Sequence, residues 1–245
     1  MLRCADELGF DYIATGHYAV TWKDENGRYR LRKASSGKDQ SYVLYSLTQE
    51  QLAKTLFPLG GYEKSFAREL AREEGIPVAD KPDSQEICFI PDHDYASFLE
   101  RYTGKASSPG NFVDGNGNFL GIHKGITRYT IGQRKGLGVS FGIPMYVTGI
   151  DAQKNQVVLG PEGSQYASEL IADRLNWIAF EEPQQEFSAE VKVRYQAKPA
   201  PALVETLDGG KVRVKFENPQ RSVTPGQAVV FYRGEEVLGG GTILK

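Results

Sequence analysis

Cys88 is the residue of this sequence best suited to covalent chemistry. It follows a polar segment and precedes two apolar residues. A cysteine in such a place either packs as a small hydrophobic residue or acts as a nucleophile. The carboxylates of Asp83 and Glu86 oppose thiolate formation, so a reactive thiol would need Lys81 or a positive group from elsewhere. The residues alone leave both interpretations open.

The remaining sulfur and imidazole groups show no ligand spacing. Cys4 lies among apolar residues at helical spacing and is expected to pack, and two cysteines are too few for a disulfide framework. His17, His93 and His123 are scattered, whereas a structural zinc site needs about four ligands in close pairs. We therefore expect neither a bound metal nor a bound organic cofactor.

Three polar segments could contact a nucleic acid. Lys38, Asp39 and Gln40 form either a polar turn capped by Asp39 or a phosphate-binding lysine beside groups that read a base edge. Residues 105–140 hold five basic side chains and one acidic one, which suits a nucleic-acid backbone or a solvated turn. The third segment combines groups for stacking and hydrogen bonding, Arg194 and Tyr195 with Gln227 farther along the chain.

These segments need elements that position them. A short apolar strand at 11–14 places Thr15, Gly16 and His17 at its carboxyl end, where ligands bind in open α/β sheets. Alternating faces and an Asn-Gly turn predict a hairpin over 18–34. Thr48 and Gln51 form a capping box, and helical patterns follow at 66–71 and 95–102.

The pattern changes from about residue 104. Glycines and short alternating segments take over, including MYVTGIDAQKNQVVLG, FSAEVKVRYQ and PALVETLDGGKVRVKF. Strands at this spacing, joined by Asp-Gly and Arg-Gly turns, predict a small antiparallel barrel.

Length and charge exclude several classes of protein. The chain has 245 residues, enough for two domains, and 40% of them are hydrophobic, as in globular proteins. No run approaches the ~18 apolar residues of a membrane helix, and acidic residues occupy the start where a signal peptide would be apolar. A net charge of −2 argues against a wholesale polyanion wrapper. We expect a soluble cytoplasmic protein with no membrane partner.

Taken together, the segments resemble one family, the bacterial tRNA-specific 2-thiouridylases, also called tRNA-uridine 2-sulfurtransferases. The matching stretches span nearly the whole chain in the family's order: DYIATGHYA, GKDQSYVLYSLTQEQLAKTLFPLG, PDSQEICFI, YTIGQRKGLG, KVRYQ and VTPGQAVVFY.

The resemblance implies a reaction and its partners. In the family, ATP with Mg²⁺ as cosubstrate adenylates the C2 oxygen of the wobble uridine of certain tRNAs. A cysteine persulfide, loaded by a sulfur-donor protein, then supplies sulfur to C2, either directly or as released sulfide. A second cysteine attacks the persulfide and is left in a disulfide that a reductant reopens. The base must leave its stack to reach the pocket.

The resemblance also implies residue roles and a fold. Cys88 matches the persulfide-carrying cysteine, Gly16 a nucleotide-contacting glycine and His17 a tRNA contact. Further tRNA contacts match Lys38, Asp39, Gln40, Arg194, Tyr195 and Gln227. The implied fold is α/β plus β: the C-terminal part of an adenine-nucleotide α-hydrolase-like α/β domain at 1–92, a central tRNA-binding domain at 93–160 and an antiparallel β-barrel at 166–245.

Two motifs of the family have no counterpart in these 245 residues. They are the glycine-rich SGGxDS loop, whose amides hold pyrophosphate, and the CNxxIKF-type segment with the second cysteine. In the family both precede the DYIATGHYA strand. We therefore expect that the chain corresponds to the last two thirds of a family member and does not complete the reaction alone. The alternative is a tRNA-binding protein without catalysis.

Overall fold

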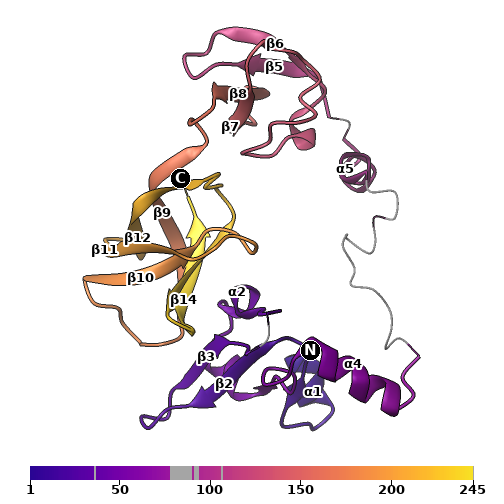
Figure 1. The fold of residues 1–245 in the computed structure, drawn as a ribbon, viewed down its shortest axis with the longest axis vertical. Helices are drawn as coiled ribbons and strands as arrows, with labels where there is room; N and C mark the ends of the chain where they lie inside the picture. The colour runs from indigo at the N-terminus through magenta and orange to yellow at the C-terminus, as the bar shows by residue number, and fades with distance from the viewer. Residues whose placement is uncertain (36, 78–89, 91–93, 106, 245) are drawn as a thin grey trace. The chain divides into compact units, whose positions relative to one another are not determined.

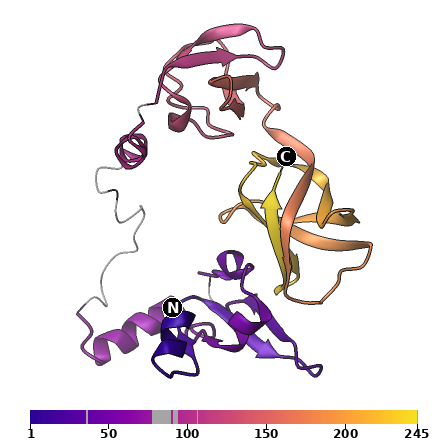
Figure 2. The ribbon, with the colours of Figure 1, turned by 180° about the vertical axis from the view of Figure 1, so that it is seen from behind.

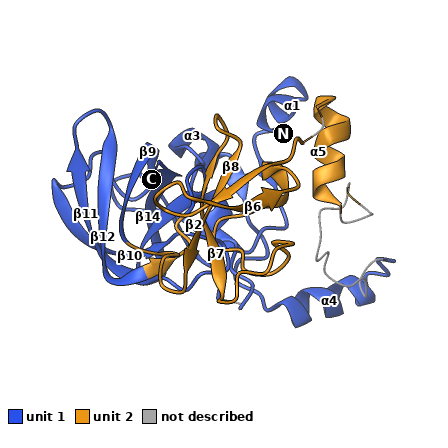
Figure 3. Ribbon diagram, turned by 90° about the horizontal axis from the view of Figure 1, so that it is seen from above, with its two compact units in different colours: residues 1–81, 168–219, 224–245 blue, residues 82–167, 220–223 orange. Residues whose placement is uncertain are grey.

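The computed structural model describes residues 1–245 except 36, 78–89, 91–93, 106 and 245. The chain divides into two compact units, coloured separately in Figure 3. Unit 1 contains residues 1–81, 168–219 and 224–245, and unit 2 contains residues 82–167 and 220–223. Unit 1 thus combines the N-terminal segment with most of the C-terminal strands.

The N-terminal segment of unit 1 is a mixed α/β fragment. Its strand β1 pairs in parallel with β4, with Ile13 opposite Thr55 and Ala14 opposite Leu56. The predicted capping box is confirmed, because the Thr48 hydroxyl accepts from the Gln51 amide and the Gln51 side chain accepts from the Thr48 amide. The elements are α1 (Leu2–Glu7), β1 (Ile13–Ala14), β2 (Ala19–Lys23), β3 (Tyr29–Lys33), α2 (Ser41–Leu44), α3 (Gln49–Ala53), β4 (Thr55–Leu56) and α4 (Lys64–Glu73).

Six C-terminal strands form an antiparallel barrel. They lie in the order β13-β10-β11-β12-β9-β14, and pairing of β13 with β14 closes the ring, seen from two sides in Figures 1 and 2. Alternate residues of β10–β12 are buried, as strand periodicity requires. The predicted barrel is confirmed. Its strands are β9 (Tyr166–Trp177), β10 (Glu186–Lys192), β11 (Ala200–Leu207), β12 (Lys211–Arg221), β13 (Ala228–Arg233) and β14 (Glu236–Ile243).

The β2–β3 hairpin continues the barrel sheet. Strand β3 joins β14, with Arg32 opposite Glu236, so that the N-terminal segment and the barrel share one sheet of eight strands. Tyr45 packs onto Gly240 of β14, where a Cβ atom would lie 2.6 Å from the Val229 carbonyl oxygen. The Asn176 side chain donates to the carbonyls of Tyr45 and Leu47 at 2.7 and 3.0 Å.

Arginines from the hairpin add a second set of contacts to this junction. The Arg28 guanidinium donates to the carbonyl oxygens of Trp177, Ile178 and Phe180 at 2.9, 2.7 and 2.6 Å. Arg30 pairs with Glu236 and, at 3.1 Å, with Asp24. The guanidinium groups thus hold the chain that leaves β9 against the hairpin.

Unit 2 is built on a separate four-stranded sheet. The strand order is β6-β5-β8-β7, and β5 pairs with β8 in parallel. Phe112, Tyr129, Val147 and Leu159 belong to its core. The elements are α5 (Tyr95–Thr103), β5 (Gly110–Val113), β6 (Phe119–His123), the 3₁₀ helix η1 (Ile126–Arg128), β7 (Met145–Asp151) and β8 (Gln156–Pro161).

Several local predictions differ from this arrangement. The first strand covers 13–14 rather than 11–14. The segment 145–160 alternates like the barrel strands but lies in the sheet of unit 2, because alternation fixes a buried face and not its neighbour. The apolar residues of α4 share a face as predicted, yet Phe66 and Leu70 are each 46% exposed. Within the described ranges no helix is long and apolar enough to cross a membrane.

Candidate functional site

The carboxyl end of β1 opens onto a cavity. The Thr15 hydroxyl lies 3.0 Å from Nδ1 of His17, and the His17 ring meets Phe57 edge-on with 6.3 Å between ring centres. Both polar side chains line a cavity of about 420 Å³ whose walls include Ile13, Leu44 and Phe57. This volume lies in the range of small-molecule sites, and mostly apolar walls with a few polar groups are their usual lining. Gly16 lies between the two polar residues.

The Lys38–Gln40 segment precedes α2, and Asp39 stabilises its fold. One carboxylate oxygen of Asp39 accepts from the amides of Ala34 and Ser41 at 3.2 and 3.0 Å. The other accepts from the Ser41 hydroxyl at 2.9 Å. The carboxylate therefore stabilises the turn that leads into α2, although the N-cap residue of this helix is Gln40 and not Asp39.

Gln40 links this turn to the residue after His17. Its side-chain oxygen accepts from the backbone amide of Tyr18 at 3.0 Å, and the backbone amide of Gln40 donates to the Tyr18 carbonyl oxygen at 2.8 Å. Such a pair copies the bonding of two adjacent strands. Gln40 thus fixes the backbone beside His17.

The predicted barrel residues meet the same turn. The Tyr195 hydroxyl donates to the carbonyl oxygen of Asp39 at 3.3 Å. The neighbouring Arg194 donates to the Thr224 hydroxyl at 2.9 Å, and the Gln227 amide donates to the Thr224 carbonyl at 3.2 Å. Residues after β10 and before β13 are thereby joined to the N-terminal segment.

The structure therefore connects six of the predicted residues along one path. Bonded or adjacent residues lead from His17 through Tyr18 to Gln40 and Asp39, then through Tyr195 and Arg194 to Thr224 and Gln227. Lys38 is exposed next to Asp39 on this path. Cys88 lies outside the described residues, and so does the segment that carries it. We name the surface around Asp39, Tyr195 and Arg194 the junction surface.

Sequence analysis missed several residues of the junction surface. Ser41 is fully buried, and its hydroxyl lies 3.3 Å from that of Tyr232. Burial raises the pKa of Tyr42 to about 12 and also raises that of Tyr232. Lys192 is the last residue of β10 and lies two residues before Arg194. The spacing of two residues between Lys192 and Arg194 was the sequence signal that could have identified Lys192.

The basic residues of 105–140 are in unit 2. Arg128 approaches the carboxylates of Asp94 and Glu100 at 4.0 and 3.8 Å. Arg134 lines a cavity of about 440 Å³ with Leu137, Phe141 and Met145. The Arg128 ion pairs and the Arg134 cavity thus both belong to unit 2.

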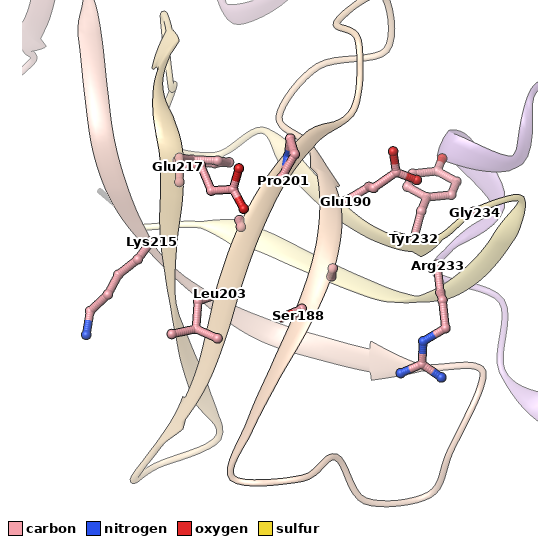
Figure 4. Close-up of a pocket in the computed structure, with 12 residues that line it drawn as sticks. Ser188, Glu190, Pro201, Leu203, Lys215, Glu217, Tyr232, Arg233 and Gly234 are labelled. Carbon is pink, nitrogen blue, oxygen red and sulfur yellow. The ribbon is translucent and has the colours of Figure 1, made fainter.

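Another cavity, of about 570 Å³, lies on the barrel and holds none of the predicted residues. Figure 4 shows Lys215 on one side of it and both Glu190 and Arg233 on the other. Lys215 pairs with Glu205 at 3.3 Å. Its charged groups do not converge on one point, so we assign no chemistry to it.

Three family models match successive parts of the chain. A family model described as tRNA methyl transferase HUP domain matches residues 1–92. The tRNA methyl transferase PRC-barrel domain matches residues 96–161, and the aminomethyltransferase beta-barrel domain matches residues 167–243.

Curated relatives match the whole chain. The tRNA-specific 2-thiouridylase MnmA of Carboxydothermus hydrogenoformans is 54% identical over 247 aligned positions, which cover 100% of this chain and 68% of the relative. The protein of the same name from Acetivibrio thermocellus is 53% identical, covering 99% of this chain and 68% of the relative. MnmA 1 of Thermoanaerobacter pseudethanolicus is 54% identical, with 99% and 67% covered.

Proposed function

The chain belongs to the tRNA-specific 2-thiouridylase family, and on this premise we propose that it acts in replacing the C2 oxygen of a wobble uridine of tRNA by sulfur. The observation that carries the proposal is the identity of 54% across the full chain. The path from His17 to Gln227 supports it, because this path gathers the residues expected to contact tRNA on one unit.

The proposed chemistry has three steps. The C2 oxygen of uridine attacks the α-phosphorus of ATP, held with Mg²⁺, and pyrophosphate leaves. The terminal sulfur of a Cys88 persulfide then bonds to C2, and AMP leaves with the former C2 oxygen. A second thiol attacks the Cys88 sulfur, which breaks the S–S bond, frees the thiolated base and leaves a disulfide for a reductant to reopen.

The chain's own residues have assigned parts in this proposal. Gly16 and His17 face the nucleotide and the tRNA at the carboxyl end of β1. Lys38, Asp39, Gln40, Arg194, Tyr195 and Gln227 orient the tRNA. We further propose a catalytic fragment at 1–92, a central tRNA-binding domain at 93–160 and the barrel at 166–245. The tRNA substrate and the persulfide-donor protein place the reaction in the cytoplasm.

Sulfur loading tests the role of Cys88 directly. The protein is incubated with a persulfide donor carrying ³⁵S, and bound label is measured with and without reductant. We expect reductant-sensitive label on the wild type and on Cys4→Ser, and none on Cys88→Ser. Cys4 is exposed and is the chain's other cysteine, so it is a matched control. Equal label on Cys88→Ser would contradict the proposal.

Assays of tRNA thiolation and of tRNA binding distinguish a sulfurtransferase from a non-catalytic tRNA-binding protein. With ATP, Mg²⁺ and a persulfide donor, thiolated tRNA is retarded in a gel that contains mercury, and tRNA affinity is measured in parallel. Retardation that requires ATP and Cys88 supports the sulfurtransferase. Affinity for tRNA without retardation is also expected of an incomplete sulfurtransferase, so a non-catalytic tRNA-binding protein is favoured only if Cys88 also takes up no ³⁵S label from the persulfide donor.

A further inference from the structure

Two lysines on the junction surface lie over tyrosine rings. The Lys192 ammonium is 5.4 Å from the ring centre of Tyr42 and 5.8 Å from that of Tyr195. The Lys33 ammonium is 4.6 Å from the ring centre of Tyr232. Attraction between an ammonium and the ring faces limits the positions that these flexible side chains adopt.

The Asp39 carboxylate, which interacts electrostatically with Lys192, is already hydrogen-bonded to other groups. Asp39 contributes to the electrostatic environment of Lys192, but its oxygens accept three hydrogen bonds from Ala34 and Ser41. Within the described residues neither Lys33 nor Lys192 has a carboxylate at ion-pair distance. Lys33 donates to the Gly234 carbonyl at 2.8 Å, which leaves its charge uncompensated.

Charges of both signs act on Lys192. Burial lowers its pKa most, the Asp39 carboxylate raises it, and the positive charge of Lys33 lowers it by a smaller amount. The two ammonium groups therefore interact, and the one carboxylate that offsets them is itself hydrogen-bonded to Ala34 and Ser41. A phosphate oxygen suits such a pair, because an ammonium is a compact charge with several donors.

We propose that Lys33 and Lys192 together bind the backbone phosphate of the tRNA next to the nucleotide that Tyr195 contacts. This inference rests on the proposed function and adds two residues to the expected contacts. The Tyr195 side chain is 43% exposed, so a base or ribose can lie against its outer part while Lys192 holds the adjoining phosphate. The lysines then supply affinity and register, and sequence selection lies elsewhere.

The test is the salt dependence of tRNA affinity. The dissociation constant of an unmodified tRNA transcript is measured for the full chain between 50 and 200 mM KCl. Each lost phosphate contact lowers the slope of log Kd against log salt by about 0.8. For Lys192→Met we therefore expect the ratio of Kd values at 200 and 50 mM to fall about threefold. Lys192→Arg keeps the charge and should keep the wild-type slope.

Controls separate the possible failures. Lys211→Met removes an exposed charge at the start of β12, outside the junction surface, and should leave the slope unchanged. A wild-type chain whose tRNA affinity is absent or independent of salt contradicts the proposed function. If the wild type shows the expected salt slope and Lys192→Met shows the same slope, the proposed phosphate binding by Lys33 and Lys192 is wrong, while the proposed function stands. If Lys192→Met does not fold, as its thermal unfolding would reveal, Lys33→Met decides by the same criterion.

Discussion

The cations around the β2–β3 hairpin fall into two groups with opposite surroundings. Arg28 and Arg30 are engaged by carbonyl and carboxylate oxygens, and Arg28 alone makes three bonds to backbone carbonyls. Lys33 and Lys192 instead lie over aromatic rings without a described acid partner. Both groups contribute positive charge to unit 1, yet the second gives up fewer internal hydrogen bonds when it takes up an external anion.

This difference separates stability from binding. A guanidinium forms a planar fork of donors, which suits several fixed acceptors at once. An ammonium on a flexible stem exchanges a ring contact for a phosphate more readily. We expect the arginines to determine whether the hairpin stays on the barrel, and the lysines to determine how tightly tRNA binds.

The largest effect is expected from Arg28→Met. The variant removes the Arg28 donor from the carbonyl oxygens of Trp177, Ile178 and Phe180, of which Ile178 keeps only a 3.3 Å bond from the Gln49 side chain. Hydrogen bonds to a charged group contribute about 1.5–3 kcal/mol each without adding fully. We expect the free energy of unfolding to fall by about 3 kcal/mol in a urea titration.

Arg32→Met is the matched control for this variant. Arg32 is exposed on the same hairpin and lies over the Trp22 ring at 5.8 Å, so its loss should change stability by less than about 0.5 kcal/mol. If Arg28→Met unfolds like Arg32→Met, the arginines do not hold the junction and the comparison fails.

Removing both lysines should produce the converse result. In Lys33→Met/Lys192→Met we expect the salt slope of tRNA affinity to fall by about 0.8, an about threefold change in the Kd ratio between 50 and 200 mM, because the two lysines hold one phosphate. The urea midpoint should stay close to that of the wild type, because no carboxylate loses its partner. A large loss of stability in the double variant would show that the lysines, like the arginines, mainly stabilise the fold.

Gln40 lies between the two groups, since its expected tRNA contact coexists with its bond to Tyr18. Gln40→Ala removes the acceptor for the Tyr18 amide and should lower the free energy of unfolding by about 1 kcal/mol. Gln40→Glu keeps that acceptor and should restore stability, while its negative charge weakens tRNA binding. Equal stability of Gln40→Ala and the wild type would show that the bond to Tyr18 has no net effect.

The smallest expected effect is a pH dependence of stability that arises from a buried histidine, His123, in unit 2. His123 is 1% exposed, its Nδ1 accepts from the Gly125 amide at 3.0 Å and its Nε2 lies 3.2 Å from the Asn155 carbonyl oxygen. Burial lowers the pKa of His123 below the unfolded value of about 6.5, although the Asn155 bond opposes this. The unfolded chain therefore binds the extra proton first, and stability falls as pH decreases through about 6.5.

Thermal unfolding at pH 7.5 and 5.5 measures this dependence. The decrease in unfolding temperature from pH 7.5 to pH 5.5 should be smaller in His123→Gln, which has no titratable group at this position. It should be unchanged in His17→Gln. An unchanged loss in His123→Gln would assign the pH dependence to other groups.

Local features of the fold were predictable because their determinants are close in sequence. The Thr48–Gln51 capping box, the hairpin turn with Gly27 at φ +81° and the helix at 95–103 each depend on a few adjacent residues. Long-range pairings were not predictable. The bond from Tyr195 to Asp39 spans 156 residues, and the parallel pairing of β5 with β8 follows from no alternation pattern.

The candidate site divides in the same way. Its residue types indicated contact with RNA, but their individual roles came from the family resemblance. The Asp39 carboxylate illustrates the gap between the two, because a turn cap and a base-reading group look alike in sequence. Only the positions of the Ala34 and Ser41 amides reveal its part in the turn.

The pairing of β3 with β14 has a consequence for synthesis of the protein. On the ribosome the hairpin emerges before its partner strand, because Glu236, opposite Arg32, follows about 200 residues later, or roughly 10–40 s at common elongation rates. During that interval the edge of β3 that will meet β14 has no strand beside it, and the carbonyls that Arg28 will bind are made only later. The nascent chain thus carries an open strand edge throughout this interval, a state in which pairing with another chain competes with folding.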